Sequence, residues 1–352
     1  MGRPIQGPKG LPVTWSEIAQ LAALYALVLW VAHEYGLLWG LVAAAGAAAL
    51  RWKAFVSLIR FALWEQWVAI DRRTRDKALL EKGFDWRPVV VLSMVAVILT
   101  GNNYFGHRQH FRYFAAKLLA QKADRPLLQG ANLRRAGGHR GVQIVYAKRF
   151  SARFGKWARI LEFGYWVGWR VVGFFLIPLL VVLLLPGERV RDYGLSTKGL
   201  REHMWVYLAL LSIVLPAVIV VSYTPGFRSH YPFPWSTTTL SRPVAGRLFV
   251  AWELMYALQF FSLEFFFRGF VLNALRRSMG AYAIFAMVVP YCMIHFGKPL
   301  PETLGAIVAG TVLGTLALGT RSIWSGVFIH VSVAWSMDIA ALIQKGAFPK
   351  FW

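Results

Sequence analysis

Apolar stretches of about the length of a membrane-spanning helix follow one another along most of the chain. A helix needs about 20 predominantly apolar residues to cross the hydrocarbon core of a bilayer. The clear candidates are Trp15–Val31, Leu37–Leu50, Phe163–Leu185, Met204–Tyr223, Leu248–Leu272, Ala281–Phe296, Thr303–Leu318 and Ile323–Ile343, and weaker ones are Phe55–Ile70 and Pro88–Thr100. The sequence therefore predicts an all-α fold, a polytopic transmembrane helix bundle with about eight to ten helical segments.

The composition agrees with a membrane environment. Of the 352 residues, 57% are hydrophobic and 16% are charged, and the mean hydropathy of +0.48 exceeds what the core of a soluble domain requires. The 16 Trp, 13 Tyr and 25 Phe residues fit aromatic belts at two bilayer interfaces. After Leu21–Val31 the chain runs directly into a second apolar stretch, which favours an uncleaved helical hairpin over a secretory signal. An integral, multi-pass membrane protein is expected.

The net charge of +23 comes from Lys and Arg residues that lie between the apolar stretches. Loops beside membrane helices retain such residues on the cytoplasmic side, where they attract anionic lipid headgroups. A soluble nucleic-acid-binding protein would instead gather them on one basic face. The expected partners at these loops are therefore anionic lipids, and no nucleic acid is expected.

A basic segment between Phe105 and Arg159, whose only acidic residue is Asp124, divides the chain. The expected units are N-terminal membrane helices over 1–104, a basic cytoplasmic or juxtamembrane segment over 105–159, and a C-terminal bundle over 160–345. A second basic stretch, Arg72–Arg87, leaves the topology open. If both basic stretches are cytoplasmic, Pro88–Thr100 cannot be a simple single span.

Two features of the C-terminal half concern packing. Cys292 is the only cysteine, so the chain has no intrachain disulfide, and its apolar neighbourhood indicates a small buried hydrophobic side chain. Ala306, Gly310 and Gly314 recur every four residues, a spacing that allows close approach between membrane helices.

Ionisable side chains inside apolar helices are costly, so each one indicates either a functional site or a neutralised structural pair. Glu264 and Arg268 are four residues apart and share one helix face, which predicts an ion pair. Glu253 lies eleven residues earlier, on the same stripe at another depth. A purely structural pair, in which Arg268 neutralises a buried carboxylate that holds two helices together, is the alternative.

Two histidines on the following apolar stretches favour a site. His295 ends one stretch and His330 lies early in the last one, with Glu302 and Asp338 close by in the sequence. A carboxylate can take a proton from water while imidazoles position the water or stabilise an oxyanion. Zinc held by the two histidines and a glutamate is a less favoured alternative, because the chain contains no His-Glu-x-x-His motif. No cofactor is expected.

The order of these motifs resembles the CAAX-protease and bacteriocin-processing family of glutamic intramembrane proteases, also called Abi proteins. The usual signatures of that family are Glu-Glu-x3-Arg, Phe-x3-His and His-x3-Asn or Asp. Here they read Leu263-Glu264-x3-Arg268, Tyr291-x3-His295 and His330-x3-Ala334, and Gly269 and the loop Asp192-Tyr193-Gly194-Leu195 also fit. The resemblance covers roughly Phe163 to Ile343. It implies a metal-independent intramembrane endopeptidase, and the expected location is the plasma (inner) membrane of a prokaryote.

The sequence departs from the family at two positions. The first glutamate of the pair, which the family uses to activate water, is Leu263, and the Asn or Asp of the last motif is Ala334. Asp338 lies one further turn along, about 6 Å away in helix rise. Either Glu264 is the base and Glu302 or Asp338 completes the site, or the chain keeps the bundle without the full catalytic set.

For an active enzyme, the expected mechanism is water attack on a peptide bond of a membrane-associated peptide or protein. Glu264 would be the general base, His295 would position the water and His330 would donate to the oxyanion. Arg268 would keep Glu264 ionised, because an isolated carboxylate in hydrocarbon stays protonated. The non-enzymatic alternative is a membrane binding, scaffold or immunity protein. A transporter is not favoured, because the sequence contains no evident inverted repeats.

Overall fold

The computed structural model describes residues 13–76, 85–133, 139–185, 187–197, 204–235 and 244–349, and these residues form helices and connecting segments without any β-strand. Seven of the helices are long and apolar enough to cross a membrane, and one bent pair could form an eighth span. The predicted polytopic helix bundle is confirmed. The chain is an integral, multi-pass membrane protein.

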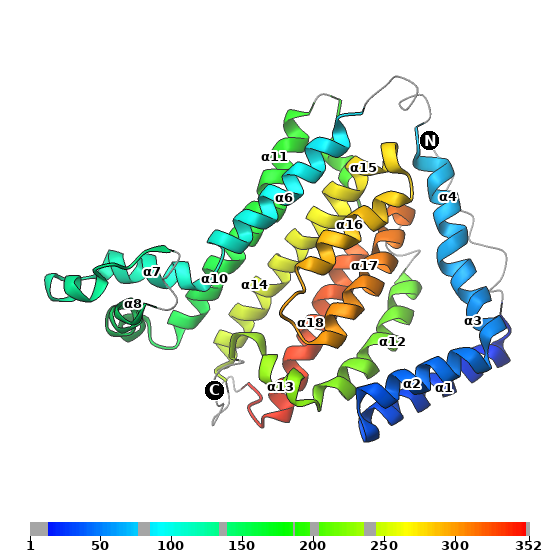
Figure 1. Ribbon diagram of the computed structural model, residues 1–352, viewed down its shortest axis with the longest axis horizontal. Helices are drawn as coiled ribbons and strands as arrows, with labels where there is room; N and C mark the ends of the chain where they lie inside the picture. The colour runs from blue at the N-terminus through cyan, green and yellow to red at the C-terminus, as the bar shows by residue number, and fades with distance from the viewer. Residues whose placement is uncertain are drawn as a thin grey trace.

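An N-terminal hairpin lies along the lower edge of the bundle (Figure 1) and is made of α1 (Trp15–Tyr35) and α2 (Leu37–Leu50). Thr14 and Glu17 form a capping box that starts α1. No residue of α1 is buried, so its apolar side chains suit contact with lipid. The hydroxyl of Tyr25 donates to the carbonyl of Ile213 on α12 (Met204–Ser222), which attaches the hairpin to the bundle.

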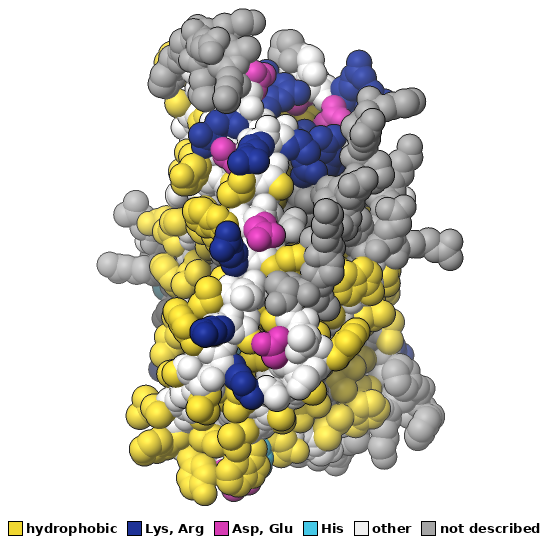
Figure 2. Space-filling view, turned by 90° about the vertical axis from the view of Figure 1, so that its right-hand side faces the viewer, with side chains coloured by type: hydrophobic (Ala, Val, Ile, Leu, Met, Phe, Trp, Pro, Cys, Tyr) yellow, Lys and Arg dark blue, Asp and Glu magenta, His cyan; other side chains and the backbone are white. Residues whose placement is uncertain are grey.

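The next helical run turns by 92° from α2 and rises along the side of the bundle (Figure 1). It consists of α3 (Trp52–Ile59), the π-helical segment η1 (Arg60–Trp64) and α4 (Glu65–Thr74). Figure 2 shows Lys and Arg side chains gathered at the upper end of this face, above a broad hydrophobic surface. The indole of Trp67 donates to Thr315, and the backbone N–H of Ala281 donates to Asp71, so α4 is hydrogen-bonded to the C-terminal bundle.

α6 (Arg87–Phe105) is one uninterrupted helix. α6 therefore separates the two basic stretches, whose described parts lie toward opposite ends of the bundle (Figure 1). Within the first stretch, 77–84 lie outside the described residues. Only one of the two stretches can consequently lie on the cytoplasmic side, where the positive-inside rule would place it.

The basic segment after α6 is helical and projects sideways from the bundle (Figure 1). Its elements are α7 (Arg108–Leu119), the 3-10 helix η2 (Lys122–Leu128), α8 (Arg140–Val145), the π-helical η4 (Tyr146–Ser151) and α9 (Ala152–Phe154). Ala116, Val142 and Val145 are fully buried and give the segment a small core of its own. Arg149 and Lys148 both bind the carboxylate of Asp124, at 2.6 and 3.4 Å.

The remaining helices form the bundle that holds the candidate site. A long bent span is built from α10 (Trp157–Val171), η5 (Val172–Leu176) and α11 (Ile177–Leu184), and a second from α14 (Gly246–Glu264), η8 (Phe265–Val271) and α15 (Leu272–Met279). The others are η6 (Val190–Tyr193), α12, α13 (Pro225–His230), η7 (Phe233–Trp235), α16 (Tyr282–Met293), α17 (Leu300–Thr320) and α18 (Trp324–Gln344).

α14, α16, α17 and α18 lie at the centre, with α6, α10 and α11 on one side and α12 and α4 on the other (Figure 1). The small-residue spacing on α17 has the predicted effect, because a Cβ added at Gly310 would lie 2.9 Å from the ring of Tyr291 on α16. Every residue of η8 is buried. Its rings Phe265 and Phe266 pack against Phe175 and Phe174 of η5, which holds the start of η8 at the centre of the bundle.

Candidate functional site

The ion pair predicted from the four-residue spacing is present at the junction of α14 and η8. Nη1 of Arg268 lies 2.8 Å from Oε1 of Glu264, and neither side chain is exposed (0% each). The guanidinium of Arg268 also lies over the ring of Tyr291, 4.1 Å from its centroid. Since a buried charge without a partner is very costly in hydrocarbon, each of these two groups requires the other.

His330 on α18 completes the environment of this carboxylate. Its Nδ1 lies 2.5 Å from the same Oε1 of Glu264 that Arg268 binds, and its Nε2 lies 2.8 Å from the hydroxyl of Tyr291. An ionised carboxylate can only accept hydrogen bonds, so the proton of His330 lies on Nδ1 and Nε2 accepts from Tyr291. The ring of Phe260 stacks on the imidazole at 5.3 Å and fixes its plane.

Gly326 allows α18 to approach the carboxylate. It lies four residues before His330, and a Cβ at this position would be 2.1 Å from Oε2 of Glu264. Oε2 itself is buried and has no hydrogen-bond partner among the described residues. The close approach of the helix backbone therefore encloses Glu264 completely.

His295 also lies beside Tyr291. Its Nδ1 donates to the carbonyl of Tyr291 at 2.8 Å, and its ring centroid is 4.8 Å from the Tyr291 ring, which is 6.1 Å from the His330 ring. The hydroxyl of Thr303 holds the carbonyl of His295 at 2.9 Å. Because Nδ1 donates, Nε2 of a neutral His295 is an acceptor. The structure thus gathers Glu264, Arg268 and His330 in one cluster. His295 lies next to the ring of Tyr291, which in turn contacts this cluster.

Two of the three acidic residues expected as support, Glu302 and Asp338, have partners elsewhere. Glu302 accepts from Lys298 at 2.5 Å and from the hydroxyl of Tyr231 at 2.7 Å. Asp338 is fully buried and accepts from the backbone N–H of Phe233 and the indole of Trp252, both at 2.8 Å.

Glu253 is buried, and its two carboxylate oxygens have no hydrogen-bond partner in the described part of the chain. It lies close enough to Asp338 for the two carboxyl groups to interact electrostatically. The two family positions that are apolar here, Leu263 and Ala334, are each only 4% exposed and pack in hydrophobic clusters. Neither position supplies a polar group to the site.

Three contributors were not identified as site residues from the sequence, namely Phe260, Tyr291 and Gly326. Each lies four residues before a predicted site residue and therefore on the same helix face. That spacing is the signal that could have identified them. Among the described residues, no group of three His, Cys, Asp or Glu side chains is arranged to hold a metal ion.

Comparison with known families agrees with this arrangement. The family model described as type II CAAX prenyl endopeptidase Rce1-like matches residues 150–336, which is more than half of the chain and includes every member of the cluster. No curated protein and no solved structure matches the chain. On the strength of the match over α10 to α18, the chain belongs to the Rce1-like family of CAAX-protease-type membrane proteins.

Proposed function

We propose that the protein is an intramembrane endopeptidase that hydrolyses a peptide bond beside this cluster, at a site formed by Glu264, His330, Tyr291 and His295. The observation that carries the proposal is the sharing of one carboxylate oxygen of Glu264 by Arg268 and His330. Such a carboxylate fixes the tautomer of the imidazole and stabilises its protonated form, which is what a histidine base requires.

Glu264 acts through His330 in this proposal, because Glu264 is unexposed and the side chain of His330 is 15% exposed. The sequence alone predicts instead that Glu264 itself is the base that takes the proton from water. Water takes the place of the Tyr291 hydroxyl at Nε2 of His330, and Nε2 of His295 accepts its second hydrogen and so orients it. The proposal is supported by the nearness of both imidazole rings to the Tyr291 ring, at 4.8 Å for His295 and 6.1 Å for His330.

The water oxygen bonds to the peptide carbonyl carbon while Nε2 of His330 takes the proton, and the released Tyr291 hydroxyl donates to the oxyanion. His330 next returns the proton to the amine nitrogen as the C–N bond breaks. The products are a carboxyl terminus and an amino terminus, and no cofactor takes part.

The substrate in this proposal is a membrane-associated peptide or protein, since Glu264 and His330 lie on helices that are long and apolar enough to cross a membrane. The basic loops bind anionic lipids rather than nucleic acid, and the protein resides in the plasma (inner) membrane of a prokaryote. Family membership supports the reaction class but does not name the substrate.

A second candidate function is that of a membrane binding, scaffold or immunity protein. The specific observation in its favour is that Leu263 and Ala334 are packed apolar side chains where catalytic family members have polar ones. The complete enclosure of Glu264 agrees with a structural role for the ion pair.

Protein termini in native membranes separate the two functions. We would compare cells that carry wild type, Glu264→Gln, Glu162→Gln or no protein. Glu162 is the matched control, because it is also a buried glutamate paired with an arginine, Arg112, at 2.9 Å. New termini with wild type and Glu162→Gln, and none with Glu264→Gln, support the protease. Identical termini in all four, with every variant inserted, favour the binding function.

A further inference from the structure

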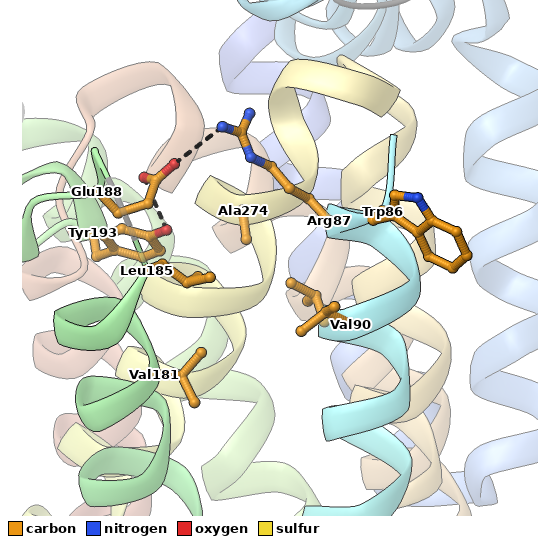
Figure 3. A pocket seen from close by; sticks show the side chains of 9 residues that line it. Trp86, Arg87, Val90, Val181, Leu185, Glu188, Tyr193 and Ala274 are labelled. Atoms are coloured by element: carbon orange, nitrogen blue, oxygen red, sulfur yellow. Dashed lines mark hydrogen bonds and ion pairs between the residues drawn. The ribbon is translucent and has the colours of Figure 1, made fainter. Parts of the chain in front are cut away.

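A second site lies away from the cluster, between the ends of α6 and α11. Figure 3 shows a pocket there, and its volume is about 170 Å³. Its walls are apolar and are formed by Val90, Val91, Val181, Leu185 and Ala274. An apolar cavity of roughly 150 Å³ can hold a benzene-sized group, so this one can hold a short length of hydrocarbon chain.

The pocket lies at a membrane boundary. The span of α6 begins at Arg87, and the span that contains α11 ends at Leu184, so both helices meet the interface beside the pocket. Trp86, which is 67% exposed, precedes α6 at this level and is one of the residues that line the pocket (Figure 3). Tryptophan is the residue type that membrane proteins place at the headgroup level.

The rim of the pocket is cationic. Arg87 and Arg277 both face the single carboxylate of Glu188, at 3.8 and 3.7 Å, and Tyr193 donates its hydroxyl to the same group at 3.1 Å. These nitrogen–oxygen distances exceed the roughly 2.7–2.9 Å of a charge-assisted hydrogen bond. The two arginine side chains are 38% and 46% exposed, so each retains donors for another anion.

A second carboxylate beside this rim is hydrogen-bonded to groups other than the two guanidinium groups. Asp85 accepts from the hydroxyl of Ser278 and from the backbone N–H of Arg87. Burial and the neighbouring carboxylate of Glu188 raise the pKa of the Tyr193 phenol, so it remains a neutral donor. Two guanidinium groups therefore share one negative side chain at the mouth of an apolar pocket.

We propose that this pocket binds one anionic phospholipid, with an acyl chain between α6 and α11 and the headgroup phosphate on Arg87 and Arg277. The apolar walls select a lipid over a free anion, and the arginine pair selects an anionic headgroup over a zwitterionic one. Arginine is suited to this task because its planar donors match phosphate oxygens.

Native mass spectrometry of the detergent-purified full-length protein, titrated with phosphatidylglycerol or phosphatidylcholine of identical acyl chains, tests the proposal. We expect preferential retention of phosphatidylglycerol. Removing the rim charges in Arg87→Gln with Arg277→Gln should weaken that binding by about fivefold for each arginine. Arg72→Gln removes an exposed arginine from the same end of the bundle and should leave it unchanged.

A second variant tests the pocket itself. Val90 is 43% exposed and lines the pocket, so Val90→Phe fills the pocket without disturbing the rim. This variant should bind both lipids more weakly. Equal affinity for the two lipids in wild type overturns the proposal. So does unchanged binding by Val90→Phe, and so does displacement of the lipid by millimolar inorganic phosphate alone, which would indicate a free-anion site.

Discussion

Nδ1 of His330 on α18 lies 2.5 Å from Oε1 of Glu264 on α14, residues that are 66 positions apart in the chain. The contact joins the first and last motifs of the site through one oxygen atom that Arg268 also binds. Because Glu264 is unexposed, the proton transfer that we propose passes through the imidazole of His330. Substitutions of the different neighbours of this oxygen should therefore have different effects.

Replacing Arg268 with Gln should destabilise the fold strongly, by about 3–5 kcal/mol, because it leaves the carboxylate of Glu264 buried and uncompensated. The double variant Glu264→Gln with Arg268→Gln should regain a large part of that loss. Reversible unfolding in mixed micelles measures both. Arg112→Gln is the control and should cost less, since Arg112 is 41% exposed. Equal losses in the single and double variants would argue against a coupled pair.

Gly326→Ala should displace the carboxylate of Glu264, because the added Cβ would lie 2.1 Å from Oε2. Overpacking of this kind costs about 1–3 kcal/mol. Gly305→Ala on α17 is the matched control, since no atom lies within 4 Å of its added Cβ. We expect it to be neutral or stabilising, as Ala is favoured over Gly in a helix. Thermal unfolding of the two variants gives the comparison, and similar midpoints would contradict the packing argument.

Tyr291→Phe should preserve the fold and impair cleavage. The ring and its contact with Arg268 remain, while the hydroxyl that binds His330 and is proposed to bind the oxyanion is lost. The loss of such a donor corresponds to a rate decrease of roughly 100-fold or more. Tyr231→Phe removes a buried hydroxyl bound to Glu302 instead, so its cleavage rate should stay near that of wild type. An equal decrease in the cleavage rates of both variants would show that the Tyr291 hydroxyl has no specific role in cleavage.

The sequence predicted the bounds of several helices well because apolar length is a local property, although Ala281–Phe296, expected as a span, contains only the short helix α16. α2 has the predicted bounds, and α17 extends the predicted Thr303–Leu318 by a few residues at each end. The 92° turn after α2 could not be predicted, since the direction of a helix depends on its distant packing partners.

The same distinction applies to the site. The pairing of Glu264 with Arg268 follows from a four-residue spacing on one helix. The contact of Glu264 with His330 does not follow from any such spacing, because the two residues lie on different helices and spacing along one helix gives no information about its neighbours. Asp338 illustrates the limit, because its carboxylate is held by Phe233 and Trp252, both far away in the sequence.

The basic segment that contains α7 to α9 should lose stability in acid. A hydrogen bond from Arg149 lowers the pKa of Asp124 to about 2. Because the folded-state pKa of Asp124 lies below the unfolded value of about 3.9, its ionised carboxylate stabilises the fold. This stabilisation is complete above pH ~4 and is lost as the pH falls toward 2. Hydrogen exchange of α8 and η4 should therefore accelerate over that range. Asp124→Asn should exchange fast already at neutral pH, and a wild-type protection that stays constant down to pH 2 would contradict the assignment.

The most direct test of the central claim is cleavage by the purified protein. Wild type and Glu264→Gln would be reconstituted separately into vesicles that carry the membrane proteins of cells lacking this chain, and the new protein termini would be counted over time. The account predicts that new termini accumulate with wild type and are absent with Glu264→Gln, while both proteins are inserted to the same extent. Equal accumulation with both proteins, or none with wild type, would contradict it.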